Sequence, residues 1–342
     1  MALNTTLRRS VVLAHRPRDE PRPEDFVIEE DAIPTPGPGE VVTRVIWLSI
    51  DPYMRGRLRE EQTYAVAIQI GEVMTGETVG EVIASNHPGF IAGDLVAGAR
   101  GWQSHSLSKG DALVKIPRGA GAAPLSTYLG VMGMPGATAY AGITEICKPK
   151  SGETVVISAA SGAVGSVAGQ LARRAGARVV GIAGGPDKCL FVQDSLGFDA
   201  CLDHRAHDLR AELRAECPNG VDAYFENVGG DIQAAVFEHL NPFARVAMCG
   251  MVSQYNESVF PPGPNLGFVV GKRVTIQGFI VSDRPARMTE WRAMAAPLIA
   301  AGELIYREDV HEGLENAPKA LIGILSGRNF GKMLVRVGPD PI

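Results

Sequence analysis

The sequence has few of the features that commit a chain to metals, membranes or nucleic acids. Its five cysteines are widely spread and form no Cys-x-x-Cys pair, so neither a zinc ribbon nor a disulfide framework is expected. No apolar run reaches about 18 residues, and no basic run exceeds three residues. With a net charge of −5, neither a membrane nor a nucleic acid is predicted as a partner. The N-terminus lacks an apolar signal core, so we expect a cytoplasmic location.

The length and composition indicate a globular protein of two domains. The chain has 342 residues, 45% hydrophobic and 21% charged, which is too long for one ordinary core. Short β-branched runs separated by turn clusters predict a barrel-like sheet over residues 24–118. Beyond residue 124, strands and helices alternate, which favours a parallel sheet with crossover helices. The expected strands of this second region are 155–157, 179–182, 199–202, 222–225, 244–249 and 273–281, its helices are 164–175, 187–196, 207–217, 231–240 and 287–301, and 332–337 is a closing strand.

A glycine-containing turn between the first two strands of that region predicts a dinucleotide site. Ala159-x-x-Gly162-Ala163-Val164-Gly165 follows a short β-branched strand and opens a helix of small residues. This unit lays a pyrophosphate on the N-terminus of a helix, and its glycines permit close backbone approach. The first glycine of the usual motif is replaced by Ala159. The alternative is a βα turn that binds nothing.

The end of the second strand indicates which dinucleotide is bound. NAD-binding proteins place an acid there for the ribose 2′-hydroxyl, but this strand ends in Ala183-Gly184-Gly185. Lys188 is the nearest cation beyond it. A small tip followed by a cation suits a 2′-phosphate, so NADPH is the predicted cofactor. The alternative is that Lys188 is an ordinary surface lysine.

Several long phrases match one family over essentially the whole chain. The chain resembles the zinc-independent medium-chain dehydrogenase/reductases, and among them the NADPH-dependent double-bond reductases that act on prostaglandins, alkenals and curcumin. The phrases are Asp51-Pro-Tyr-Met-Arg55, Gly133-Met-Pro-Gly-Ala-Thr-Ala-Tyr140, Ala159-Ala-Ser-Gly-Ala-Val-Gly165, Glu226-Asn-Val-Gly-Gly230, Cys249-Gly-Met-Val-Ser-Gln-Tyr-Asn256, Pro261-Pro-Gly-Pro264 and Asn329-Phe-Gly-Lys332.

The resemblance implies an α/β fold and a reaction. A Rossmann doubly wound parallel sheet (127–303) would be inserted into a GroES-like β-barrel catalytic domain (1–126 and 304–342), with the active site in the cleft. A homodimer would form by edge pairing near Val274–Ile280. NADPH would reduce the C=C bond of an α,β-unsaturated ketone or aldehyde, with hydride going to the β-carbon and a proton to the α-carbon.

Zinc chemistry is not expected. Alcohol dehydrogenases of this superfamily place a cysteine near Ser49–Asp51 and a histidine within the stretch corresponding to Thr75–Glu77, and both positions lack them here. Of the seven histidines, only His204 and His207 have a metal-site spacing. Fewer than three candidate ligands argue against a Lewis acid.

Without a metal, hydrogen-bond donors must stabilise the enolate oxygen. Tyr255, just after the fifth Rossmann strand, and Tyr53, in Asp-Pro-Tyr-Met-Arg, are the candidate catalytic donors. The alternative for each is that it only packs the wall of the site. The resemblance further implies cofactor contacts. The expected cofactor-binding residues are Gly162, Ala163, Val164, Gly165, Gly184, Lys188, His204 (where mammalian prostaglandin reductases have a tyrosine near the 2′-phosphate), Asn227, Cys249, Gly250, Ser253, Tyr255, Phe279, Val281 and Asn329.

Two other functions remain open at this point. The first is a zinc-free quinone reductase, against which the Asp-Pro-Tyr-Met and Pro-Pro-Gly-Pro phrases argue. The second is a non-catalytic NADPH-binding protein, against which the presence of Tyr53 and Tyr255 argues.

Overall fold

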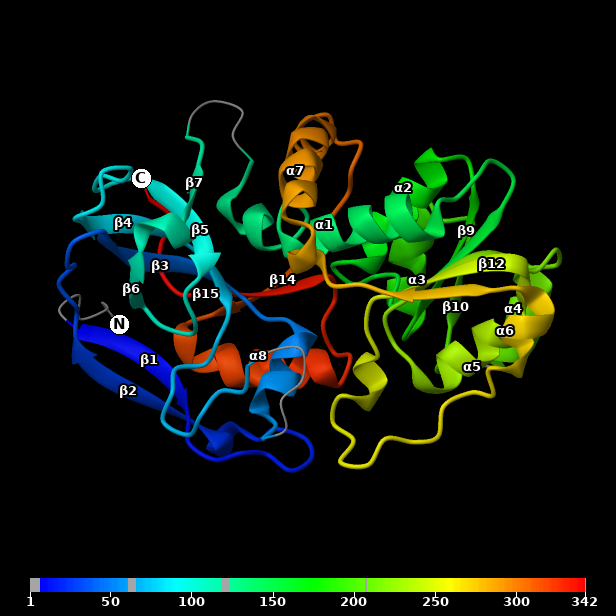
Figure 1. Cartoon of the computed structure of the whole chain (residues 1–342), viewed down its shortest axis with the longest axis horizontal. Helices are drawn as coiled ribbons and strands as arrows, with labels where there is room; N and C mark the ends of the chain where they lie inside the picture. The colour runs from blue at the N-terminus through cyan, green and yellow to red at the C-terminus, as the bar shows by residue number, and fades with distance from the viewer. Residues whose placement is uncertain (1–6, 61–65, 119–122, 207, 342) are drawn as a thin grey trace. The chain divides into compact units, whose positions relative to one another are not determined.

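The computed structural model (Figure 1) describes residues 7–60, 66–118, 123–206 and 208–341. The chain divides into two compact units. No helix among the described residues has the length and apolar character needed to cross a membrane. Unit 1 comprises Met1–Leu129, Glu308–Asn329 and Met333–Ile342, and unit 2 comprises Gly130–Arg307 and Phe330–Lys332.

Unit 1 is built on antiparallel β-structure from both parts of the chain. Its larger sheet has the order β14-β15-β3-β4-β5-β7, with β6 also paired to β3, and β1 pairs with β2 separately. A core that includes Leu48, Ile50 and Trp102 is fully buried against helix α8. The elements are β1 (Leu7–Leu13), β2 (Phe26–Ala32), β3 (Glu40–Ser49), the 3-10 helix η2 (Pro52–Leu58), β4 (Glu77–Ser85), β5 (Leu95–Ala99), β6 (His105–Lys109), β7 (Val114–Ile116), β14 (Glu308–Glu312), α8 (Ala317–Leu325) and β15 (Lys332–Arg336).

Unit 2 contains a parallel sheet of order β10-β9-β8-β11-β12-β13. This is the strand order of a Rossmann fold, whose topological switch point lies between its first and fourth strands, here β8 and β11. The strands are β8 (Thr154–Ser158), β9 (Arg178–Ala183), β10 (Ala200–Asp203), β11 (Val221–Glu226), β12 (Leu240–Met248) and β13 (Thr275–Gly278).

The crossover helices of unit 2 follow the alternation expected from the sequence. The predicted helix 187–196 is α3 continued by a wider π-helical turn, and the predicted strand 273–281 is shorter. Every residue of β8 is buried, as expected for a central parallel strand. The helices are α1 (Met134–Ala141), α2 (Gly165–Arg174), α3 (Pro186–Leu190), the π-helical η6 (Phe191–Ser195), α4 (Leu209–Glu216), α5 (Gly230–Glu238), the 3-10 helix η7 (Val252–Gln254), α6 (Gly267–Lys272), the 3-10 helix η8 (Val281–Asp283) and α7 (Pro285–Ala300).

Candidate cofactor-binding site

The turn after β8 has the tight geometry that a pyrophosphate site needs. Ala159 adopts a left-handed conformation with φ of 48°, which normally favours glycine. A Cβ on Gly165 would lie 2.3 Å from the Ala159 carbonyl oxygen, and one on Gly162 would lie 3.1 Å from the same atom. Helix α2 therefore starts directly against the strand end. Ala163 and Val164 lie in this turn, between the two glycines.

The tip of β9 is organised by an acid from the neighbouring strand. Asp203, the last residue of β10, accepts hydrogen bonds through Oδ1 from the amides of Gly185 (2.8 Å) and Arg205 (3.0 Å). Burial alone would raise the pKa of this carboxyl, but those two amides and the nearby His204 and Arg205 lower it. The carboxylate is thus engaged by backbone groups of the tip.

Three basic side chains gather around this tip. A Cβ on Gly184 would lie 2.9 Å from His204 Nε2 and 2.8 Å from Arg205 Nε. Partial desolvation and the positive charges of Arg205 and Lys188 lower the pKa of His204, while Asp203 acts in the opposite direction. Lys188, His204 and Arg205 are called the basic cluster below. Sequence reasoning missed Arg205, because the turn after β10 brings it to Gly184 from a distant position in the chain.

A buried glutamate orders the loop after β11. Glu226, with no exposed surface, accepts hydrogen bonds through Oε1 from Val228 N (2.6 Å), Gly229 N (3.1 Å) and Ser158 Oγ (2.9 Å). Burial raises its pKa, and those donors partly offset the effect. Asn227 donates from its backbone N to Ser158 Oγ and from Nδ2 to Ser158 O, both at 2.8 Å. The ends of β8 and β11 are therefore fastened together at the switch point.

The loops after β11 and β12 hold each other through backbone hydrogen bonds. Val252 N donates to Asn227 O (3.2 Å), and Ser253 donates to Val228 O from both N (3.0 Å) and Oγ (2.6 Å). The Tyr255 hydroxyl accepts a long hydrogen bond from Met251 N (3.4 Å). Asn227, Ser253 and Tyr255 are thus brought to one edge of the sheet, at the carboxyl ends of its strands.

The other predicted residues of unit 2 lie close by. Cys249 and Gly250 directly follow β12, and a Cβ on Gly250 would approach the Tyr255 hydroxyl to 3.0 Å. Phe279 follows β13 and makes an edge-on contact with Phe225 at 6.2 Å between ring centroids. Val281 begins η8.

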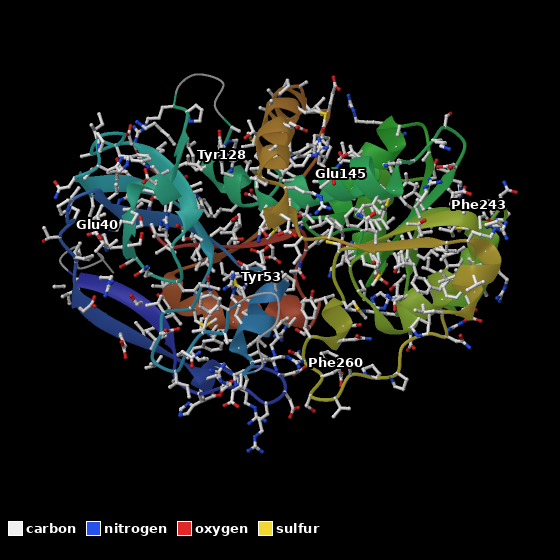
Figure 2. The ribbon with its side chains drawn as sticks, viewed as in Figure 1. Glu40, Tyr53, Tyr128, Glu145, Phe243 and Phe260 are labelled. Carbon is white, nitrogen blue, oxygen red and sulfur yellow. The ribbon has the colours of Figure 1, made fainter. Side chains whose placement is uncertain are left out.

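Two predicted residues belong to unit 1. Tyr53 (labelled in Figure 2) lies on η2, is partly buried against the hydrophobic core of that unit, and carries the Arg57 guanidinium 5.6 Å above its ring. Asn329 lies between α8 and β15.

No group of three or more His, Cys, Asp or Glu side chains suited to a metal occurs within the described ranges. His207, one half of the histidine pair considered above, lies outside those ranges.

The geometry is that of a dinucleotide site, and comparisons with known proteins extend it. Residues 9–116 match a family model described as the N-terminal domain of oxidoreductase, and residues 163–301 match one described as zinc-binding dehydrogenase. The NADPH-dependent curcumin reductase of Escherichia coli strain K12 is 47% identical over 338 residues, which are 97% of each protein. The chain belongs to the NADPH-dependent double-bond reductases of the medium-chain dehydrogenase/reductase family.

Two further relatives of this reductase cover nearly the whole chain. The 2-alkenal reductase (NADP(+)-dependent) of Nicotiana tabacum is 42% identical over 97% of this chain and 98% of its own. The crystal structure of CurA in complex with NADPH from Vibrio vulnificus has a TM-score of 0.93 and 46% identity, covering 97% of this chain and 100% of that one. The predicted family, fold class, enzyme class and NADPH cofactor are confirmed.

Proposed function

We propose that this reductase transfers hydride from NADPH to the β-carbon of an α,β-unsaturated ketone or aldehyde, without a metal. The observation that carries the cofactor assignment is the basic cluster at the tip of β9, combined with an Asp203 carboxylate held by two backbone amides. Cations around a strand end formed by small residues suit a 2′-phosphate, whereas recognition of a ribose 2′-hydroxyl would require a free acid at that strand end. The names of the closely similar proteins support the substrate class.

The turn Ala159–Gly165 and the N-terminus of α2 would hold the pyrophosphate, since backbone amides and the helix dipole both favour an anion there. Lys188, His204 and Arg205 would hold the 2′-phosphate. Asn227, Cys249, Gly250, Ser253, Phe279, Val281 and Asn329 would form the rest of the cofactor site. NADPH, when bound, supplies the hydride.

The chain itself must stabilise the negative charge that develops on the substrate oxygen. Tyr255 is our candidate donor, because it follows β12 at the sheet edge where ligands of such folds bind. Its oxygen already accepts from the Met251 amide, and a phenol that accepts one hydrogen bond can still donate its own proton. Tyr53 is the second candidate. The α-carbon takes its proton in a separate step, so hydride and proton together complete the reduction of the C=C bond.

The same family argument supports a homodimer. β13 is the last strand of the parallel sheet, and within the described residues it pairs on one side alone, with β12. Its Thr275, Gln277 and Gly278 are exposed. We propose that this edge pairs with the same edge of a second copy.

Oxidation of NADPH, followed at its absorbance with and without a simple enone, tests the function directly. We expect enone-dependent oxidation and a product that has lost the C=C bond but kept the carbonyl. Oxidation with quinones and not with enones would establish the quinone reductase alternative. Tight NADPH binding with no turnover on a panel of both would establish a non-catalytic protein.

A further inference from the structure

Two cysteine thiols meet beside the proposed 2′-phosphate site. Cys189 lies on α3, next to Lys188, and Cys201 lies on β10, two residues before Asp203. Helix α3 and strand β10 pack against each other, and each of the two thiols affects the ionisation of the other. Both line one pocket of about 460 Å³, which is also lined by Asp203, Glu212 and Glu216. The pair is therefore reachable by a small molecule from solvent.

The other three cysteines differ from Cys189 in the pKa of their thiols. Burial raises the pKa of Cys147 to about 12, of Cys217 to about 11 and of Cys249 to about 12, so these thiols stay protonated and unreactive at neutral pH. At Cys189, by contrast, the hydrogen bond from Cys201 lowers the pKa. A thiolate is the form that attacks an oxidant.

We propose that Cys189 and Cys201 form an oxidative modification site, at which hydrogen peroxide, a small neutral oxidant, converts the dithiol to a disulfide. The Cys189 thiolate attacks one oxygen of the peroxide and the O–O bond breaks. Hydroxide departs, and Cys189 is left as a sulfenic acid. The Cys201 sulfur then attacks that sulfur, and water leaves. The two thiols lose two protons and two electrons in total, and hydrogen peroxide is reduced to two waters. The three carboxylates of the pocket disfavour an anionic oxidant such as a glutathione disulfide.

The modification bears on the cofactor site, and this second part rests on the proposed function. A disulfide bond is about 2 Å long, shorter than any non-bonded contact between two sulfur atoms. Both cysteines are free here, so α3 and β10 must approach each other when the bond forms. α3 carries Lys188, and β10 ends at Asp203, directly before His204 and Arg205. Closing the bond therefore shifts the basic cluster and weakens binding of the 2′-phosphate.

The test treats the reduced full-length protein with hydrogen peroxide, followed by peptide mapping and NADPH titration. We expect a peptide joined through Cys189 and Cys201, and a loss of NADPH affinity of about tenfold, the factor contributed by one charged contact. A thiol reductant should restore the affinity. Cys201→Ser should instead trap a sulfenic acid on Cys189 and keep its NADPH affinity. Cys217→Ala is the matched control and should still cross-link.

The possible results bear separately on the modification site, on its coupling to NADPH binding and on the proposed 2′-phosphate site. Absence of the cross-linked peptide, or cross-linking through other cysteines, overturns the modification site. A disulfide that leaves NADPH affinity unchanged overturns the coupling. Failure of the reduced protein to prefer NADPH over NADH counts against the proposed 2′-phosphate site instead, and leaves the cross-link to be judged by mass alone.

Discussion

The basic cluster gives a prediction in which two cations can be compared with each other. Lys188→Ala and Arg205→Ala should each weaken NADPH binding while leaving NADH binding nearly unchanged, because NADH lacks the 2′-phosphate. The role of Lys188 was expected from the sequence, whereas the role of Arg205 depends on how the turn after β10 places it. Arg205 lies within reach of a Cβ on Gly184, and its charge acts on His204.

The size of the effect follows from the exposure of these groups. A hydrogen bond to a charged group contributes about 1.5–3 kcal/mol, and about 1.4 kcal/mol corresponds to a factor of ten. Arg205 is exposed and Lys188 is partly exposed, so water screens their charges and the lower end of that range applies. We expect about a tenfold rise in the dissociation constant for each single variant. The double variant should lose less than the product of the two, since both contacts serve one phosphate.

Fluorescence titration with NADPH and NADH measures both constants on the same protein. Arg214→Ala, which removes another exposed arginine from the helix that follows, is the matched control and should change neither. Raising the salt from about 0.1 M to about 1 M shortens the Debye length from about 10 Å to about 3 Å. NADPH affinity should fall with salt much more than NADH affinity. Equal losses for both cofactors in Arg205→Ala would refute the reasoning, because the arginine would then act on folding or on a shared part of the cofactor.

The other predictions concern the titrating groups, the tyrosine and metals. Tyr255→Phe should lower kcat by about tenfold, less than the hundredfold or more typical of a single oxyanion donor, because other donors remain; an unchanged kcat with several enones would make it a packing residue. The pKa of His204 is lowered in the free protein, and a bound 2′-phosphate would raise it. NADPH affinity should therefore be greatest below the His204 pKa of the free protein and fall as pH rises through the His204 pKa of the NADPH complex. His204→Gln should flatten this pH profile. Because the pKa of Glu226 is raised in the folded protein, the free energy of unfolding should fall as pH rises from the ordinary pKa of 4.5 through the folded-state value. Glu226→Gln should remove this pH dependence in denaturant titrations. Glu226→Ala should lower the free energy of unfolding by about 3 kcal/mol, because the donors to Glu226 would be left unpaired. Exhaustive chelation should leave enone reduction intact, and a tightly bound zinc whose removal abolishes activity would contradict the proposed mechanism.

The Rossmann half of the fold was predictable because its strands are apolar and its turn has a strong local signature. All of β8 is buried, and every residue before its final serine is β-branched, so both its secondary structure and its central place in the sheet follow from the sequence. β14, by contrast, reads Glu-Asp-Val-His-Glu and lies at a sheet edge. No hydrophobic period identifies it, and its partner β15 decides its conformation. β1 lay outside the expected all-β region because two arginines interrupt its apolar residues.

The site was predictable to the extent that its residues stand in local phrases. Lys188 and Tyr255 could be selected from neighbouring residues, whereas Arg205 could not, since its relevance comes from a tertiary contact with Gly184. The role of Glu226 in joining β8 to the loop after β11 was likewise hidden, because its partner Ser158 is 68 residues away.

The mutual backbone hydrogen bonds between the loops after β11 and β12 have a consequence for protein engineering. Asn227 and Val228 accept from Val252 and Ser253 through main-chain atoms, so the register of one segment dictates that of the other. Transplanting 249–256 alone from another reductase would bring a segment shaped for a different partner. A graft that carries 226–230 along with it preserves the pairing, and these two stretches are best treated as a single exchangeable cassette.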